Sequence, residues 1–336
     1  MRSRIEDVAA AAGVSMKTVS RVLNNEPNVR DEMRQRVMAA VEKLQYRPNL
    51  SARSLAGQRS YVVALVYNNP SRNYLMEIQS GMLDACRDHH YNLVLAPVGS
   101  PKQRKAEDLK VVFEHFAPDG VVLIPPLTDD PAVLEFLEQH EVPYASIAPK
   151  HPEGRIGVMM DETAAVLELM AGLVAQGHRR IAHIKGPPAH GACQWRYKGY
   201  RDALKKAGLE YDADLVVQGA FSFESGIAAG DALLHLKQPP TAIFAANDDM
   251  AAGVIRAACE RGLAVPRDIS VCGFDDTPIA RHIYPALTTV RQPTSEMGKL
   301  ATLQLLARIR AADAGSMVHV EHEVLFREST QAPKGR

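Results

Sequence analysis

The chain has 336 residues, of which 46% are hydrophobic and 23% are charged, so it is long enough for two domains and apolar enough to bury a core. This composition excludes disordered and fibrous proteins. Lys plus Arg and Asp plus Glu both total 39, yet residues 1–60 carry eleven basic against six acidic side chains, which leaves 28 against 33 in the remainder. A basic end on an acidic body predicts that this end alone meets a polyanion.

Cysteine usage and hydropathy bear on the cellular compartment. The N-terminus is charged and lacks the apolar run of a signal peptide, and no stretch approaches eighteen consecutive apolar residues. We therefore expect a soluble, cytoplasmic protein. Four cysteines lie far apart without a C-x-x-C motif, and we expect them to be reduced, buried thiols: Cys86, Cys193, Cys259 and Cys272.

The first part of the chain has the pattern of three short helices. Apolar residues recur at helical spacing over residues 5–12 until Gly13 breaks the run, and Ser15 is a suitable N-cap for a second helix. After a loop at residues 24–28, a third apolar face runs through residues 33–44. This segment is predicted to be a small all-helical domain.

From Tyr61 onward, short apolar runs alternate with longer amphipathic ones. Strands buried on both faces that alternate with helices predict doubly wound parallel sheets, and their number favours two α/β lobes over a single sheet. We expect a Pro- and Gly-rich break near residues 149–161 to separate the lobes. The predicted strands are Val62–Tyr67, Asn92–Pro97, Gly120–Ile124, Tyr144–Ile147, Arg180–Lys185, Ala242–Ala246 and Ile269–Phe274. The predicted helices are Leu75–His89, Lys102–Phe116, Glu162–Ala175, Trp195–Ala207, Glu224–Leu236, Met250–Arg261 and Ser295–Ala311.

Residues 5–24 match a helix-turn-helix, in which two helices are joined by a short turn that contains Gly. Ala9 is small where the helices cross, Gly13 supplies left-handed backbone, and Val19 packs the second helix on the first. Such patterns also occur in ordinary surface helices, but the basic charge excess favours DNA binding. The second helix would present these side chains to the major groove: Ser15, Met16, Lys17, Ser20, Arg21 and Asn24.

Ten stretches along the chain together indicate a family. In the first part they are Val8-Ala-Ala-Ala-Ala-Gly-Val-Ser15, Thr18-Val-Ser-Arg-Val-Leu-Asn24, Tyr46-Arg-Pro-Asn49 and Ala52-Arg-Ser-Leu-Ala-Gly57. In the body they are Pro118-Asp-Gly-Val-Val122, Gly177-His-Arg-Arg-Ile-Ala182, Arg196-Tyr-Lys-Gly-Tyr200, Ala246-Asn-Asp248, Gly273-Phe-Asp-Asp-Thr277 and Pro285-Ala-Leu-Thr-Thr-Val-Arg-Gln-Pro293. Over essentially its whole length the chain resembles the LacI–GalR family of bacterial transcription regulators. The resemblance implies a helix-turn-helix head, a hinge helix and a two-lobed body like a periplasmic sugar-binding protein, in a homodimer that holds a small effector between the lobes.

The resemblance also implies domain limits. The head would comprise residues 1–47, the hinge 48–59, and the effector-binding and dimerisation domain 60–336. Its first lobe would take about 60–160 and 292–320, and its second about 161–291 and 321–330. A hinge helix of eight residues, Asn49–Ala56, is too short to be stable in isolation and should fold on DNA. By the family's pattern Leu55 wedges into the minor groove, and Arg4 joins the DNA-binding residues; without the resemblance, a linker anchor would be favoured for Leu55.

Enzyme and metal sites find no support in the residues. No G-x-G-x-x-G follows a predicted strand, Gly186–Gly191 is not followed by the Lys and Ser/Thr of a phosphate loop, and no G-x-S-x-G occurs. His319-Val-Glu-His-Glu323 lies in a predicted strand with period-two alternation at Val318–Phe326 and matches no zincin order. We expect neither enzymatic activity nor a cofactor or metal.

Candidate effector contacts follow predicted strands, where open α/β sheets bind ligands. Guanidinium and carboxylate groups can hold vicinal hydroxyls bidentately. Arg196 and Asp275 could instead pair with each other, and Phe221 could belong to the core. The resemblance implies three polar contacts, a packed aromatic, a further polar residue and a contact from the other lobe: Arg196, Asn247, Asp275, Phe221, His190 and Tyr74.

Two departures from the family bear on the effector. Ala148 stands where many members carry an aspartate, and Thr294 where an aromatic occurs, so a β-galactoside is disfavoured. Phe221 beside hydroxyl-binding groups favours a sugar or sugar derivative over a purine. We expect a repressor of a carbohydrate-utilisation operon that binds pseudo-palindromic operator DNA. A regulator responding to a purine, and a sugar-binding protein without DNA function, are the alternatives. Residues 331–336 form no heptad tail, so we expect a homodimer, and no membrane partner is expected.

Overall fold

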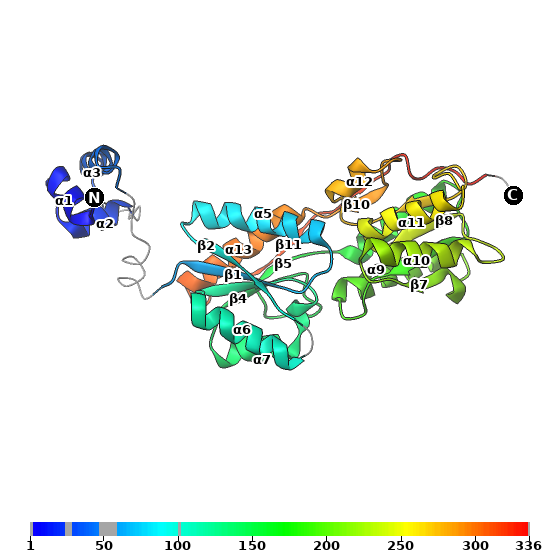
Figure 1. Cartoon of the computed structure of the whole chain (residues 1–336), viewed down its shortest axis with the longest axis horizontal. Helices are drawn as coiled ribbons and strands as arrows, with labels where there is room; N and C mark the ends of the chain where they lie inside the picture. The colour runs from blue at the N-terminus through cyan, green and yellow to red at the C-terminus, as the bar shows by residue number, and fades with distance from the viewer. Residues whose placement is uncertain (1–2, 24–28, 47–58, 100–101, 335–336) are drawn as a thin grey trace. The chain divides into compact units, whose positions relative to one another are not determined.

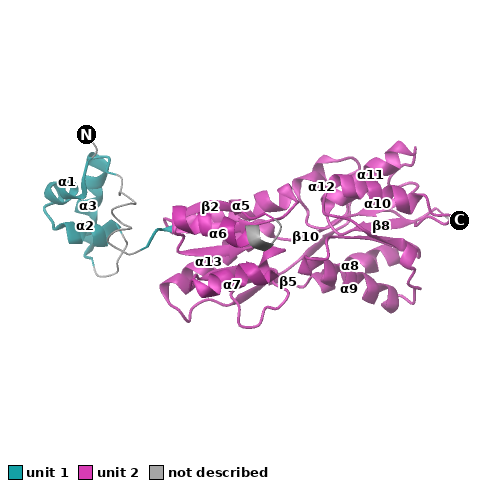
Figure 2. Ribbon diagram, turned by 60° about the horizontal axis from the view of Figure 1, so that its bottom comes forward, with its two compact units in different colours: residues 1–61 teal, residues 62–336 magenta. Residues whose placement is uncertain are grey.

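The computed structural model describes residues 3–23, 29–46, 59–99 and 102–334. Figure 1 shows the elements in chain order. The chain divides into two compact units, Met1–Tyr61 and Val62–Arg336, which are teal and magenta in Figure 2. In the described part of the first unit the helices are α1 (Ile5–Ala12), α2 (Met16–Leu23) and α3 (Asp31–Lys43).

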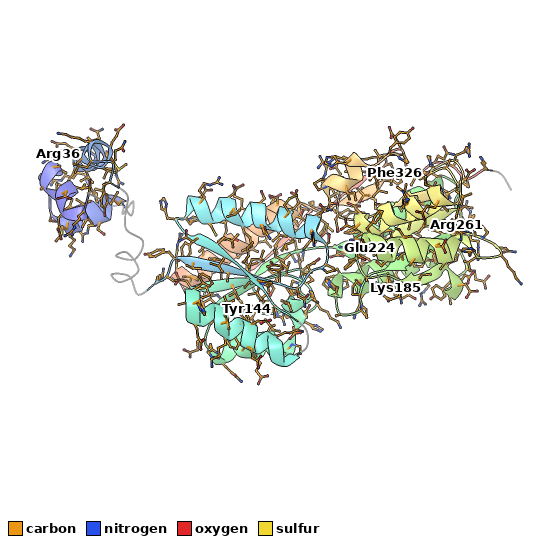
Figure 3. All side chains as sticks on the ribbon, viewed as in Figure 1. Arg36, Tyr144, Lys185, Glu224, Arg261 and Phe326 are labelled. Carbon is orange, nitrogen blue, oxygen red and sulfur yellow. The ribbon has the colours of Figure 1, made fainter. Side chains whose placement is uncertain are left out.

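Gly13 makes the turn between α1 and α2. Its φ is 64°, in the left-handed region that favours glycine, and an added Cβ would lie 2.8 Å from the Arg36 guanidinium. Arg36, labelled in Figure 3, reaches from α3 and donates to the Ala12 carbonyl oxygen at 2.6 Å. Buried valines of the three helices, Val8, Val19 and Val37, form the centre of the core. The predicted helix-turn-helix is therefore present.

The first lobe of the second unit has a sheet of six parallel strands within the described residues, in the order β11-β5-β4-β3-β1-β2. Helices α5 and α13 pack together on one face, and α6 and α7 cover the other (Figure 1). The order β2-β1-β3-β4-β5 is that of a doubly wound sheet. The strands are β1 (Val62–Tyr67), β2 (Asn92–Pro97), β3 (Gly120–Leu123), β4 (Tyr144–Ile147), β5 (Gly157–Met160) and β11 (Met317–Val320). The helices are α5 (Arg72–Asp88), α6 (Lys102–Phe116), α7 (Pro131–Gln139) and α13 (Thr294–Arg310), with a short 3-10 turn, η1 (Leu127–Asp129).

The second lobe repeats this arrangement. Its described strands form a parallel sheet in the order β7-β6-β8-β9, with α8 and α9 on one face and α10 and α11 on the other. The strands are β6 (Ile181–Lys185), β7 (Val216–Gln218), β8 (Ala242–Ala245) and β9 (Ser270–Cys272). The helices are α8 (Glu162–Ala175), α9 (Gly191–Lys206), α10 (Phe223–Leu234), α11 (Asp248–Glu260) and α12 (Pro278–His282), with the 3-10 turn η2 (Ala213–Leu215).

A short antiparallel pair, β10 (Thr289–Arg291) and β12 (Glu323–Leu325), lies beside the second sheet. Isolated bridges join Cys272 to Thr288 and Asp275 to Arg291, so β10 runs next to β9. The chain passes between the lobes after β5, after β10 and after β11. These passes bring the carboxyl end of β10 to the junction of the lobes.

The predicted fold class is confirmed, but two details of it are wrong. Val318–Phe326 is not one strand, because the chain leaves the first sheet after Val320 and β12 pairs with β10 in another sheet. Residues 149–161 are not simply a break, because they contain β5. Gly157 begins that strand so close to β4 that a Cβ would lie 1.9 Å from the Ser146 carbonyl oxygen.

The cysteines are free, as predicted, and three of them are buried. Cys259 is exposed, contrary to the prediction, because it lies on the outer side of α11 beside the buried Ala257 and Ala258. Over the described ranges, none of the helices combines the length and the hydrophobicity that a membrane span requires.

Candidate functional site

A cavity in the second unit is lined by residues of both lobes. Its volume is about 30 Å³, which is room for one or two water molecules. Most of its walls come from segments that follow a strand, at the edge where open α/β sheets bind ligands. The described lining consists of Asn69, Ser71, Tyr74, Pro125, Ala148, Glu162, His190, Ala192, Arg196, Phe221, Asn247, Asp275 and Gln292.

All six residues that the sequence proposes as effector contacts line this cavity. Tyr74 comes from α5 in the first lobe. The others come from segments that follow β6, β7, β8 and β9 in the second lobe: His190, Arg196, Phe221, Asn247 and Asp275. The structure therefore brings together side chains that lie up to 201 positions apart, between Tyr74 and Asp275.

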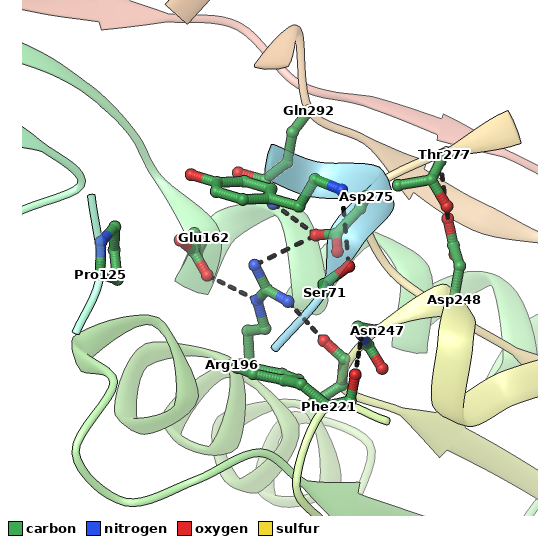
Figure 4. Close-up of polar contacts among 12 residues, drawn as sticks. Ser71, Pro125, Glu162, Arg196, Phe221, Asn247, Asp248, Asp275, Thr277 and Gln292 are labelled. Atoms are coloured by element: carbon green, nitrogen blue, oxygen red, sulfur yellow. Dashed lines mark hydrogen bonds and ion pairs between the residues drawn. The ribbon is translucent and has the colours of Figure 1, made fainter. Parts of the chain in front are cut away.

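Arg196 is buried on α9, and its guanidinium is bonded within the protein on several sides (Figure 4). Nε donates to Glu162 Oε2 at 2.7 Å, one terminal nitrogen donates to the Ala246 carbonyl oxygen, and the other lies 3.4 Å from Asp275 Oδ1. The guanidinium also lies 3.8 Å from the centre of the Phe274 ring, a cation–π contact. The pairing of Arg196 with Asp275 that the sequence left open is thus present, within the second lobe.

Asp275 shares its Oδ1 atom between Arg196 and Gln292, whose Nε2 donates to it at 2.6 Å. Burial raises the pKa of the Asp275 carboxyl to about 7; Arg196 and Gln292 lower that pKa, whereas the nearby Glu162 and Asp249 carboxylates raise it. Near neutral pH this carboxyl is therefore present in both its charged and its protonated form.

An aromatic wall and two neutral polar groups complete the cavity. The His190 and Phe221 rings meet edge to face, with centroids 5.1 Å apart. Burial, and secondarily the charge of Arg196, lower the pKa of His190 to about 4, so its imidazole is neutral at pH 7. Burial also raises the pKa of Tyr74, so its phenol stays protonated. Both groups can exchange hydrogen bonds with a ligand hydroxyl.

The backbone is strained at three lining positions. Ala148, Phe221 and Asp275 have φ values of 48°, 60° and 117°, in the region that favours glycine. Such conformations cost about 1–3 kcal/mol each and gather at functional sites. Because the three residues come from different loops, this concentration favours a binding role for the cavity.

Hydrogen bonds join the two lobes beside the cavity. Asp249, on α11 of the second lobe, accepts from Ser71 Oγ at 2.7 Å and from Asn73 Nδ2 at 3.0 Å, both at the start of α5 in the first lobe. Asn247 caps α11 by accepting from the Met250 N–H at 3.0 Å. Asp249 does not line the cavity, but Ser71, which donates to it, does.

The residues of α2 that the sequence assigns to DNA lie on its outer side. Met16, Lys17 and Arg21 are exposed, whereas Val19 and Val22 face the core. Ser15, also exposed, has a second role, because its Oγ accepts from the Thr18 N–H at 3.2 Å and so caps α2. Ser20 is half-buried and Arg4 is exposed at the start of α1. Asn24 and Leu55, with the predicted hinge helix at 49–56, lie outside the described residues.

Comparisons with known proteins agree with this architecture. Residues 4–49 match the model described as "Bacterial regulatory proteins, lacI family", and residues 170–330 match a periplasmic binding protein-like domain. The chain is 34% identical to catabolite control protein A of Priestia megaterium, over 98% of this chain and 100% of that protein. It is 35% identical to the HTH-type transcriptional regulator CelR of Thermobifida fusca, over 98% of both. The chain belongs to the LacI family.

Solved structures show the same relationship. A complex of the transcriptional regulator CelR with cellobiose has a TM-score of 0.75 and 34% identity, and covers 98% of this chain and 100% of that one. The lac repressor dimer bound to operator and an anti-inducer has a TM-score of 0.79 and 27% identity, with 99% and 100% covered. This LacI-family chain is thus a DNA-binding transcriptional regulator.

The sequence did not single out four polar residues that line the cavity in this LacI-family protein: Asn69, Ser71, Glu162 and Gln292. Glu162 begins α8 directly after β5, Gln292 follows β10, and Ser71 caps α5 after β1. A position after a strand was the available signal. Glu162 and Gln292 were missed because β5 and β10 were not predicted as strands, whereas Asn69 and Ser71 follow β1, which was predicted. Among the described residues no cluster of three or more potential metal ligands occurs.

The raised pKa of Asp275 generates a prediction for stability against pH. Between about pH 4 and pH 7 the folded protein holds a proton that the unfolded chain releases, so this carboxyl's contribution to the free energy of unfolding falls as pH rises through that window. We expect the free energy of unfolding of wild type, minus that of Asp275→Asn, to fall from pH 5 to pH 7 and to level off above pH 8. Urea unfolding followed by fluorescence of the single tryptophan, Trp195, measures it. If this difference in the free energy of unfolding rises with pH, the pKa of Asp275 is not raised in the folded protein.

Proposed function

We propose that this regulator represses a carbohydrate-utilisation operon and that a small sugar or sugar derivative, bound in the cavity between the lobes, changes its affinity for the operator. The convergence of Phe221, His190, Tyr74 and the Arg196 network in one cavity carries the proposal. An aromatic face packs on a sugar ring, while neutral and charged polar groups around it bind hydroxyls.

The names of the relatives support a sugar. CelR appears in complex with cellobiose, and a ribose operon repressor of Haemophilus influenzae is 32% identical over 91% of this chain. A purine is the second candidate, because a repressor named PurR from Vibrio atlanticus is 30% identical over 97% of this chain. The edge-to-face packing of His190 against Phe221 favours the sugar, because a purine would stack better between two parallel aromatic faces.

The head supplies DNA recognition in this proposal. The exposed side of α2 lies in the major groove, where Lys17 and Arg21 contact the operator, and Arg21 reads a guanine. Residues 48–59 form the hinge, and Leu55 wedges into the minor groove. A pseudo-palindromic operator requires a two-fold dimer, which the operator-bound lac repressor dimer supports. The protein acts on DNA in the cytoplasm and catalyses no reaction.

Coupling between the two sites follows from movement of the lobes. A ligand shifts an equilibrium between two lobe arrangements only by its difference in affinity for them. Contacts that span the cavity, from Tyr74 on one side and Phe221 on the other, supply such a difference. The Asp249 contact with Ser71 and Asn73 stabilises the lobe arrangement seen here. It assists a ligand that prefers this arrangement and opposes a ligand that prefers another.

Arg21→Ala tests the DNA reading. Loss of bidentate contact with a guanine should weaken operator binding by about 1–3 kcal/mol and relax the base preference at one operator position. Fluorescence anisotropy at fixed salt, with single-base operator variants, measures both effects. Lys43→Ala, an exposed cation at the end of α3, is the matched control and should keep the base preference. If Arg21→Ala lowers the affinity for operator and for random DNA equally, Arg21 contacts a phosphate and does not read a base.

Phe221→Leu tests the effector site. Leu keeps most of the apolar volume but removes the flat face, so a sugar found by thermal-shift screening of neutral mono- and disaccharides should bind about tenfold or more weakly. Operator affinity without the sugar should stay within about twofold. Phe223→Leu, an exposed aromatic on α10, is the control and should bind as wild type. If Phe221→Leu binds the sugar with unchanged affinity, the sugar does not pack on Phe221 and the proposed effector site is wrong. Arg196 is less suitable here, because its ion pairs also hold the fold together.

A further inference from the structure

The cavity holds more carboxyl groups than cations. Arg196 is the one Lys or Arg side chain among the described residues that line it, whereas Glu162 and Asp275 both do so. All three are nearly inaccessible, with exposed fractions of 4%, 2% and 5%. His190 adds no charge at neutral pH, because burial lowers its pKa to about 4.

The positive charge of Arg196 is already matched by acceptors of the protein. Glu162 at 2.7 Å, the Ala246 carbonyl oxygen and Asp275 at 3.4 Å surround its three nitrogens. Glu162 begins α8 and Asp275 follows β9, and both side chains are buried beside Arg196. A ligand anion that approached Arg196 would therefore meet two carboxyl groups held beside it.

A third carboxylate stands next to these two. Asp249 is not part of the lining, but it accepts hydrogen bonds from Asn73 and from Ser71, which does line the cavity, and its charge raises the pKa of Asp275. Carboxylate oxygens accept hydrogen bonds from hydroxyl or ammonium groups, but they repel phosphate and carboxylate groups. At pH 7.5, above the pKa of about 7 that burial gives the Asp275 carboxyl, negative charge therefore exceeds positive charge beside the cavity.

We propose that the cavity selects against negative charge: it takes an uncharged or amino-substituted sugar and rejects sugar phosphates and uronates, with Glu162 as the residue that sets this selection. The inference rests on the proposed function and narrows its ligand class. A hydroxyl donates to the surplus carboxyl oxygens without bringing a charge, and an ammonium group offsets their charge. A bound anion has no comparable compensation, because the single guanidinium is shared already.

The test compares ligands that differ in charge on one ring. The probes are D-glucose, D-glucosamine, D-glucuronate and D-glucose 6-phosphate, with the matching galactose and mannose series, titrated into the full-length protein by calorimetry at pH 7.5. In the series that binds, we expect the amino sugar to bind within about tenfold of the neutral sugar or more tightly, and both anions to bind at least about 100-fold more weakly. An anionic sugar that binds within tenfold of its neutral parent overturns the inference.

Variants of the wild-type protein identify the source of the selection. Glu162→Gln keeps a hydrogen-bonding side chain beside Arg196 but removes one charge. It should therefore reduce the ratio of the affinities for neutral and anionic sugars by about tenfold or more. Asp249→Asn, beside the cavity, should reduce this affinity ratio less. It provides a second test should the buried Glu162→Gln variant fail to fold. Glu224→Gln, an exposed carboxylate of α10 labelled in Figure 3, is the control and should leave this affinity ratio unchanged. An unchanged affinity ratio in both Glu162→Gln and Asp249→Asn overturns the inference.

The proposed function and this inference fail in different ways. An anionic sugar that binds tightly to wild type and weakly to Phe221→Leu overturns the charge selection while the effector site stands. A sugar whose affinity is the same in wild type and Phe221→Leu binds elsewhere, and that result overturns both.

Discussion

The buried guanidinium of Arg196 is the interaction on which the second lobe and its site depend. It joins the start of α8 through Glu162, the end of β8 through the Ala246 carbonyl oxygen, and the segment after β9 through Asp275. Two buried carboxyl groups so close together would repel each other strongly in a medium of low polarity. One cation therefore permits three chain segments to meet at the edge of the sheet, and the charge left over shapes what can bind there.

The topology explains why the site lies at this edge. Both sheets are doubly wound, and their strands end in loops whose residues line one cavity. The backbone strain at Ala148, Phe221 and Asp275 shows that these loops are held by their surroundings and not by their own preferences. The cavity has a volume of about 30 Å³, and beside it Asp249 of the second lobe accepts a hydrogen bond from Ser71 of the first. Residues of both lobes therefore meet at the place where the proposed effector would bind.

The sequence predicted those parts of the fold that periodicity determines. The strand at Val62–Tyr67 and the helix at Glu162–Ala175 have the predicted bounds, because each is a long run with a clear apolar pattern and a turn or cap at its ends. β5, β7 and β10 have three or four residues, and β7 and β10 each end on a polar residue; shortness alone is not the cause, because the four-residue β4 was predicted with the observed bounds. β11 and β12 were merged because alternation continues across the point where the chain changes sheets.

The six effector contacts proposed from the sequence remain predictions, although the structure places them around one cavity. The six proposed contacts share one cavity because the resemblance to a family carries information on tertiary arrangement that spacing lacks. Glu162 was placed in a helix but not in the site, because its role arises only from the approach of α8 to α9, which no local pattern encodes. The exposure of Cys259 was likewise missed, since residue type alone says nothing of which side of α11 it occupies.

Charge rescue at Arg196 tests the central claim most directly. Arg196→Met leaves two carboxyl groups buried without their cation, and the free energy of unfolding, measured with urea at pH 7.5 by Trp195 fluorescence, should fall by about 3–5 kcal/mol. Adding Glu162→Gln and Asp275→Asn removes the uncompensated charges, so the triple variant should regain a large part of that loss. A triple variant no more stable than Arg196→Met would contradict the view that charge compensation by Arg196 holds the site together.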